Sequence, residues 1–180
     1  MSNGIIVWLT GLSASGKSTI ATAVAAELRS RQIPTVVLDG DVLRKTVSPE
    51  LGFSHADRDE NVRRVGGIAQ VLAEQGLVVL VALISPYRGA RDRVRAQAAH
   101  FIEVFINAPL NVCEARDPKG YYHLARSGQV RSFTGVSDDY EAPLSAEVEC
   151  HTDLEDIETS VRRVLQAIER KLEAAGAQFG

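Results

Sequence analysis

The sequence has few cysteines, no long hydrophobic run and no block of like charges. Its 180 residues include two cysteines, Cys113 and Cys150, which form neither a CxxC pair nor the spacing of a metal site. We therefore expect two half-buried free thiols in a reducing compartment. The longest apolar run, residues 77–84, is eight residues long, whereas a membrane span requires roughly 20. This run length predicts no membrane partner.

Neither sign of charge dominates the chain. Lys and Arg number 20 and Asp and Glu number 23, so the net charge is −3 with neutral histidines. No face is polybasic, which argues against nucleic acid as a partner. The N-terminal MSNG has no basic residues ahead of its apolar stretch, and we expect a cytoplasmic protein without a secretory signal. Length and the absence of repeats predict one domain over residues 1–180.

Short β-branched runs alternate with longer helical patterns. The alternation predicts an α/β fold with a P-loop NTPase-like parallel sheet and helices on both faces. Ser54 and Asp57 have the spacing of a capping box. The predicted strands are residues 5–10, 34–39, 77–84 and 101–107, and the predicted helices are 17–31, 57–75, 87–99, 109–116 and 153–174. The last helix is expected to bury one face made of Leu154, Ile157, Val161, Leu165 and Ile168.

One segment, residues 117–147, interrupts the alternation. It is rich in Gly, Ser, Pro and Asp and has no strand pattern. A connection of this length in a compact domain is usually functional or disordered. Its interleaved aromatic residues, among them Tyr122 and Phe133, argue against disorder. We interpret the segment as a mobile lid.

A phosphate-binding loop follows the first predicted strand and opens the first predicted helix. Its backbone N–H groups and the helix N-terminus favour phosphate oxygens. In such a loop Lys17 reaches the β- and γ-phosphates of ATP, and the Ser18 hydroxyl ligates Mg²⁺. The motif GxxxxGK[ST] and its flank give the ATP-binding set Gly11, Leu12, Ser13, Ala14, Ser15, Gly16, Lys17, Ser18 and Thr19.

Two carboxylates, Asp39 and Asp41, lie at the carboxyl end of the second predicted strand. The carboxyl ends of parallel strands face the ligand crevice of such a sheet. One of these acids could hold Mg²⁺, directly or through water, and the other could accept a proton from a substrate hydroxyl. Asp41 could also be only a helix N-cap.

Further polar residues stand at the start of the third helix and after the third strand. Arg58 and Asn61 share a helix face, and Arg suits phosphate-like anions. A solvated helix face, with Phe53 in the core, is the alternative. Ser85 could contact a ligand or cap the following helix.

In order, six segments of this chain resemble the adenylylsulfate kinase (APS kinase) family over about residues 5–155. They are GLSASGKST at 11–19, LDGDVLR at 38–44, LGFSHADRDENVRR at 51–64, ISPYR at 84–88, FIEVFINAPLNVCEARDPKG at 101–120 and FTGVSDDYEAP at 133–143. The resemblance implies transfer of the γ-phosphoryl of ATP to the 3′-hydroxyl of adenosine 5′-phosphosulfate (APS), giving PAPS and ADP in sulfate assimilation. It also implies Mg²⁺ with ATP, a homodimer and a possible association with ATP sulfurylase.

The resemblance also assigns site residues. Lys17, Asp39 and Asp41 are the expected catalytic groups, and Phe53 and Phe133 are expected to sandwich the APS adenine. The family has a phosphoserine position at Ser85, but we expect direct transfer because phosphoryl transfer needs positioning more than a covalent relay. The expected substrate-binding residues are Asp41, Val42, Leu43, Arg44, Phe53, Arg58, Asp59, Glu60, Asn61, Ile84, Ser85, Lys119, Ser132 and Phe133.

The chain departs from the family pattern at several positions. Ala14 stands where the family often has Gly, and we expect tolerance if its φ is negative. Val42 replaces a common Asn, Tyr121 a common Leu, Ser132 a common Gly and Asp139 a common Pro. These changes bear on APS affinity and lid motion.

Other functions are compatible with a P-loop. A kinase for another small nucleotide-like acceptor, or a catalytically silent nucleotide-binding partner of ATP sulfurylase, are the alternatives. The sequence contains no NKxD motif, which argues against a guanine-specific switch.

Overall fold

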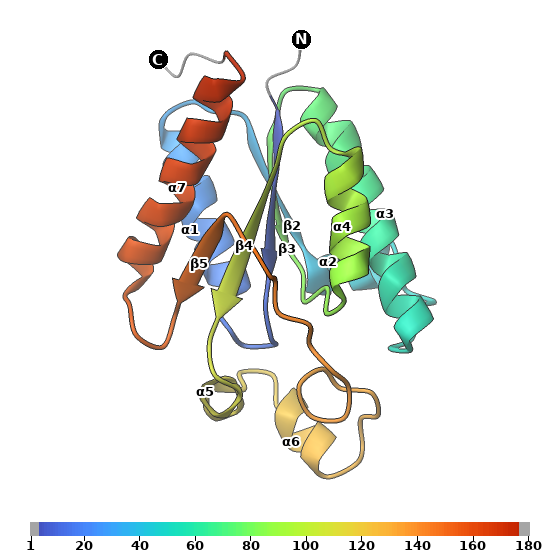
Figure 1. The fold of residues 1–180 in the computed structure, drawn as a ribbon. Helices are drawn as coiled ribbons and strands as arrows, with labels where there is room; N and C mark the ends of the chain where they lie inside the picture. The colour runs from blue at the N-terminus through green and yellow to red at the C-terminus, as the bar shows by residue number, and fades with distance from the viewer. Residues whose placement is uncertain (1–3, 177–180) are drawn as a thin grey trace.

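The structure, a computed structural model, describes residues 4–176 and contains one parallel sheet (Figure 1). All pairings in the sheet are parallel, and the strand order is β2-β3-β1-β4-β5. The strands are β1 (Ile5–Thr10), β2 (Thr35–Asp39), β3 (Val78–Ala82), β4 (Phe101–Asn107) and β5 (Val148–His151). The predicted α/β class is confirmed.

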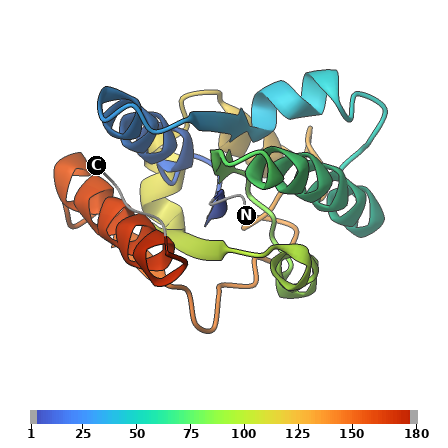
Figure 2. The same ribbon diagram turned by 90° about the horizontal axis from the view of Figure 1, so that it is seen from above.

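Helices cover both faces of the sheet (Figure 2). One face carries α1 (Lys17–Ser30) and α7 (Ile157–Ala174), and the other carries α3 (His55–Glu74) and α4 (Arg88–Gln97). Three short helices lie at the carboxyl ends of the strands (Figure 1). They are α2 (Gly40–Thr46), α5 (Leu110–Arg116) and α6 (Tyr121–Arg126).

The central strand explains this two-sided cover. Every residue of β1 is buried, because alternate side chains enter two different cores. Ile5, Val7 and Leu9 join the core under α1 and α7. Ile6 and Trp8 join the core under α3 and α4. The carboxyl end of β1 is therefore held rigidly where the P-loop begins.

Several predicted elements agree closely with the structure. The bounds of β1 and β4 coincide with the predictions, and the capping box of Ser54 and Asp57 is present at the start of α3. Cys113 and Cys150 are free and fully buried, more so than expected. No helix within residues 4–176 combines the length and apolar character of a membrane span.

Other expectations were incomplete or wrong. The strand β5 and the helices α2 and α6 were not foreseen. The last helix begins at Ile157 because the Asp156 side chain accepts a hydrogen bond from the Thr159 N–H and caps it. Leu154 lies before this helix and is 80% exposed, and Ile157 is 52% exposed. The prediction that these two residues belong to the buried face is therefore wrong.

Candidate active site

The P-loop occupies the turn between β1 and α1, and two glycines make its path possible. A Cβ at Gly11 would lie 2.4 Å from the Ile106 carbonyl oxygen of β4, so only glycine fits there. Gly16 is the N-cap of α1 with a φ of 109°, a conformation that side chains rarely adopt. The loop can therefore curl tightly and direct its N–H groups to the first turn of α1.

Lys17 is buried and folded back over the loop. Its Nζ donates to the carbonyl oxygens of Gly11 at 3.0 Å and Leu12 at 2.6 Å. Burial lowers the pKa of this ammonium from 10.5 to about 8, because desolvation disfavours its charged form. The P-loop therefore holds a cation ready to exchange carbonyl partners for phosphate oxygens.

Ser18 and Asp39 face one another across the end of β2. The Ser18 hydroxyl donates to Asp39 Oδ2 at 2.6 Å, and the Asp41 N–H donates to Asp39 Oδ1 at 2.9 Å. Asp39 is thus the N-cap of α2. The alternative in which Asp41 caps this helix is wrong, because Asp41 lies in its first turn.

Asp41 meets the lid. Its Oδ2 forms an ion pair with Nζ of Lys119, which lies in the turn between α5 and α6. Both side chains are about half exposed. The structure therefore brings a carboxylate, a lid lysine and the Ser18–Asp39 pair to the same edge of the sheet.

Phe53 is exposed rather than in the core, so the alternative that buried it is wrong. Its ring is 53% exposed, with the guanidinium of Arg44 at 4.6 Å and that of Arg58 at 5.5 Å from the ring centroid. Arg44 also donates to the Gly52 carbonyl oxygen at 2.6 Å. Two arginines therefore hold the exposed Phe53 ring between α2 and α3.

Arg58 connects α3 with the lid. Its Nε donates to the Phe53 carbonyl oxygen at 3.0 Å, and its Nη2 donates to the Ser132 carbonyl oxygen at 2.5 Å. Nε also lies 3.4 Å from Asp138 Oδ2. Phe133, next to Ser132, packs edge-on against Tyr122 with ring centroids 5.0 Å apart. One buried guanidinium thus holds the backbones beside both predicted adenine-binding aromatics.

The remaining α3 residues separate into two groups. Asn61 is buried, and its Oδ1 has no hydrogen-bond partner within the described part of the chain. Asp59 instead pairs with Arg93 of α4 at 2.6 Å, and Glu60 pairs with Arg63 and Arg64 on its own helix. Within residues 4–176, Asn61 and Asp59 therefore each retain an unused buried acceptor, at Oδ1 in both cases, but only Asn61 lacks an ion-pair partner as well.

The α2 residues Val42 and Leu43 also differ in environment. Val42 is 58% exposed, whereas Leu43 packs into the core under α3 and α4. Only the Val42 side chain is thus open to a ligand.

Ser85 lies in the loop after β3 with a φ of 42°. Its Oγ accepts from Trp8 Nε1 at 2.9 Å and donates to the Leu83 carbonyl oxygen at 3.2 Å. The N-cap of α4 is Tyr87, so Ser85 does not cap this helix. Beside it, the Ile84 carbonyl oxygen accepts from the Thr10 hydroxyl at 2.7 Å. The Ser85 hydroxyl is thus buried with both hydrogen bonds made.

Two departures from the family pattern fall at unusual backbone conformations. Ala14 has a φ of 60° and Ser132 a φ of 54°. We expected alanine to be tolerated in place of glycine at position 14 if its φ were negative, and its φ is positive. Left-handed conformations cost non-glycine residues roughly 1–2 kcal/mol, so both positions are strained. The other two lid departures, Tyr121 and Asp139, are exposed.

Sequence reasoning missed three residues that contact the P-loop. Arg116 Nη1 donates to the Ser15 carbonyl oxygen at 3.3 Å, and Thr152 Oγ1 donates to the same oxygen at 2.6 Å. The Tyr122 hydroxyl donates to the Ser13 carbonyl oxygen at 3.0 Å. Arg116 lies within the quoted segment 101–120, whereas Tyr122 and Thr152 belong to no motif, and their signal is only their place next to the ends of α6 and β5.

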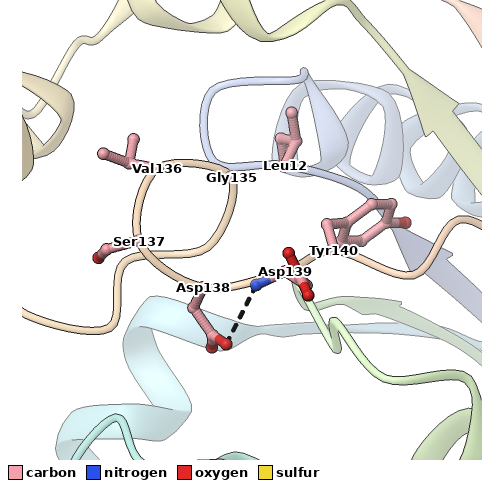
Figure 3. A pocket seen from close by; sticks show the side chains of 7 residues that line it. All are labelled: Leu12, Gly135, Val136, Ser137, Asp138, Asp139 and Tyr140. Carbon is pink, nitrogen blue, oxygen red and sulfur yellow. Dashed lines mark hydrogen bonds between the residues drawn. The ribbon is translucent and has the colours of Figure 1, made fainter.

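A pocket of about 520 Å³ opens between the P-loop and the lid (Figure 3). Leu12 lines one side, and the turn 135–140 of the lid lines the other. Asp138 and Tyr140 belong to this turn, and Asp138 also contacts Arg58. The opening therefore lies between Leu12 of the P-loop and the lid turn 135–140, next to the Arg58 partner Asp138.

Comparisons with known proteins agree on one family. The family model described as adenylylsulphate kinase matches residues 3–151. The adenylyl-sulfate kinase of Gloeothece citriformis is 53% identical over 167 residues, covering 93% of this chain and 95% of that protein.

Two solved structures extend the likeness to the fold. The structure of the Mycobacterium tuberculosis APS kinase in complex with AMPPNP and APS has a TM-score of 0.90 and 42% identity, covering 94% of this chain and 99% of that one. A hexameric APS kinase from Thiobacillus denitrificans has a TM-score of 0.69 and 32% identity, covering 93% of this chain and 29% of that one.

Proposed function

The chain belongs to the adenylylsulphate kinase family, and we propose that its site divides into an ATP half and an acceptor half that meet at Asp41. The enzyme transfers the γ-phosphoryl of ATP to the 3′-hydroxyl of APS, giving PAPS and ADP. The observation that carries the division is the convergence of Lys17, the Ser18–Asp39 pair and the Asp41–Lys119 pair at one sheet edge. The residue roles below are proposals built on that geometry.

Ser18 and Asp39 fit a magnesium ion bound with ATP. Mg²⁺ prefers oxygen ligands and usually takes one or two from the protein and the rest from phosphates and water. Within residues 4–176 no group of three or more His, Cys, Asp or Glu could hold a metal. The Ser18 hydroxyl and the Asp39 carboxylate, 2.6 Å apart, would supply the one or two protein ligands of such an ion, either directly or through water. The bound ion would neutralise charge on the transferring phosphoryl group.

Asp41 would orient or deprotonate the 3′-hydroxyl of APS. Its carboxylate is exposed and lies beside the P-loop edge, as a base for the acceptor requires. Lys119, now paired with Asp41, would move with the lid to the phosphates when the acceptor takes its place. Lys17 and Lys119 would then stabilise charge on the γ-phosphoryl group, and closure would exclude water as a competing acceptor.

The acceptor half would lie between α2, α3 and the lid. Phe53 and Phe133 would stack on the APS adenine, supported by Arg44 and Arg58. The free Oδ1 of Asn61 supports a contact with the nucleotide, because a buried unpaired acceptor is costly and is expected to find a donor.

The adenine of ATP would lie on the opposite side of the P-loop, near Arg116 and Thr152. Both residues bond to the backbone around Ser15 or to each other. A planar guanidinium at this position suits stacking on a base.

Transfer would be direct, without a phosphoserine at Ser85. The Ser85 hydroxyl is 2% exposed and bonded to Trp8 and Leu83, so it has no free path to a γ-phosphate. We expect Ser85→Ala to keep far more activity than Lys17→Ala. Equal losses in the two variants, with APS still bound, would contradict direct transfer.

The test of the function is Mg²⁺-dependent release of ADP from ATP with APS, AMP, adenosine or gluconate as acceptor. APS-selective release with a 3′-phosphorylated product is expected. Release with another acceptor would instead support a different small-molecule kinase. Tight ATP binding without release would support the silent partner of ATP sulfurylase.

A homodimer in the cytoplasm is part of the proposal. Its support is the family membership together with two free, buried cysteines, which suit a reducing compartment. Light scattering on the purified protein, alone and mixed with ATP sulfurylase, would measure the assembly. A monomer in the first sample, or no co-elution in the second, would remove the corresponding part.

A further inference from the structure

We propose that Arg91 of α4 is a positioning residue for the acceptor, because one buried guanidinium holds both Ser85 and the returning end of the lid. This inference rests on the proposed function, since it concerns the APS half of the same site. Arg91 lies outside every motif that the sequence analysis selected.

The three nitrogens of Arg91 reach three different segments. Nε donates to Glu103 Oε1 on β4 at 2.6 Å, Nη1 to the Ser85 carbonyl oxygen at 2.7 Å, and Nη2 to the Glu141 carbonyl oxygen at 2.8 Å. The side chain is 2% exposed. A planar group with donors in a fixed fork can hold three acceptors in one relative geometry, whereas a lysine cannot.

Ser85 needs such support. Its φ of 42° is unfavourable for a non-glycine residue, and such conformations persist only where the surroundings determine them. The Ser85 hydroxyl is held by Trp8 and Leu83, but its carbonyl is held by Arg91. Loss of that bond would free the peptide after Ser85 to rotate and would displace the loop that faces APS.

The second contact fixes where the lid rejoins the domain. The Glu141 N–H donates to the Pro86 carbonyl oxygen at 2.8 Å, and Glu141 Oε2 accepts from the Arg88 N–H at 2.8 Å. The neighbouring Tyr140 ring lies 5.9 Å from the Arg91 guanidinium, and its hydroxyl is 2.9 Å from Thr10 Oγ1. The Arg91 guanidinium therefore holds in place both Ser85 and the end of the lid segment that carries Phe133 and Asp138.

This network meets the ATP half at Thr10, directly before the P-loop, through Tyr140, but the hydrogen bonds of Arg91 itself go to Glu103, Ser85 and Glu141. The hydrogen bonds of Lys17 and of Thr152 Oγ1 go to the P-loop backbone and Ser15. A change at Arg91 is therefore expected to alter acceptor binding selectively, whereas general loosening of the fold would affect both substrates.

The experiment compares Arg91→Lys with Arg95→Lys. Arg95 lies one turn further along α4 and pairs with the same carboxylate, at 3.3 Å from Glu103 Oε2, but its other partner is Glu147. Loss of a hydrogen bond from a charged donor corresponds to about tenfold or more in binding. We expect Arg91→Lys to raise the KM for APS by about this factor while the KM for ATP changes less than about twofold. We expect Arg95→Lys to leave both values within about twofold.

Two results would overturn the positioning role. One is an unchanged KM for APS in Arg91→Lys, and the other is an equal rise in the KM values for APS and ATP. If Arg91→Lys does not fold, Glu103→Gln keeps the shape and an oxygen acceptor while removing the carboxylate that holds Nε. It should raise the KM for APS alone, and no change would equally overturn the role. The wild-type enzyme separates the two hypotheses: failure to phosphorylate APS contradicts the proposed function, whereas an active wild type beside an unchanged variant contradicts only the inference.

Discussion

At the residue scale, the site is prepared by side chains whose present partners substitute for the ligands. Lys17 is bonded to carbonyl oxygens of its own loop, and Ser18 to Asp39. Each of these contacts is polar and local, so a phosphate or a metal ion can replace it without unfolding any element. The P-loop is therefore preorganised in charge before the nucleotide arrives.

Lys17 makes ATP binding sensitive to alkaline pH. Its pKa is about 8 in the free protein because burial disfavours the charge, and phosphate must bind the protonated form. Affinity is therefore full below pH 8 and falls as the pH rises through that value. Titration calorimetry should show Kd for ATP rising about tenfold between pH 7 and 9. Lys17→Met should bind weakly with no such dependence; a flat profile in the wild type would contradict the argument.

Ala14 predicts a substitution that stabilises the enzyme. Because Ala14 has a φ of 60°, Ala14→Gly relieves roughly 1–2 kcal/mol of backbone strain. Glycine also loses more conformational entropy on folding, which costs about 0.5–1 kcal/mol. A net gain of about 0.5–1 kcal/mol is expected from urea unfolding. Ala26→Gly, at an exposed position inside α1, is the matched control and should cost about 1 kcal/mol. Equal losses in both variants would refute the role of φ.

At the element scale, the sequence predicted the elements that long patterns encode and missed those that local geometry decides. The β1 and β4 strands are continuous apolar runs, and their bounds follow from burial alone. The four residues of β5 include the exposed Glu149 and carry too short a pattern. The α2 helix depends on the cap at Asp39, whereas the sequence suggested only Asp41 as a cap.

The same limit applies to the site. The P-loop and both aspartates follow strands, so the topology of a parallel sheet places them together. Arg91 and Tyr122 act through contacts with backbone carbonyls far away in the sequence, at Glu141 and Ser13. Such contacts follow from the three-dimensional packing and have no spacing signature.

The corner between β2 and α2 allows capping to be separated from catalysis. Asn caps helices about as well as Asp, so Asp39→Asn should keep the free energy of unfolding within about 0.5 kcal/mol. It loses the carboxylate proposed for Mg²⁺, so kcat should fall by about 100-fold or more. Asp156→Asn, the same change at the N-cap of α7, should leave kcat unaltered. Normal turnover of Asp39→Asn over a Mg²⁺ titration would remove this residue from the metal site.

At the scale of the whole molecule, the lid is held at both ends and is most exposed in between. Residues 127–132 are mostly exposed, and Arg131 makes no ion pair with the described residues. The second half is tied to α3 and α4 through Asp138, Tyr140 and Glu141. Motion is therefore expected mainly in residues 127–131, between Tyr122, which bonds to the P-loop, and Ser132, which bonds to Arg58.

Limited proteolysis checks this asymmetry. Trypsin should cleave after Arg131 early in the free enzyme, and ATP with APS should slow that cut several-fold. Cleavage by a glutamate-specific protease after Glu141 should be slow with or without ligands, because both its backbone groups and its carboxylate are bonded. Rapid, ligand-sensitive cleavage at Glu141 would show that the whole lid moves as one body.

The position of Trp8 gives the enzyme its own optical signal. It is the chain's single tryptophan, is fully buried, stacks on Phe101 at 6.3 Å and donates its indole N–H to Ser85. Emission from an indole follows the hydrogen bond at its nitrogen and the polarity around its ring, and no second indole dilutes the change. Acceptor binding beside Ser85 is therefore expected to register in the fluorescence of the unlabelled protein, so that the acceptor half can be titrated with the ATP half left empty or filled.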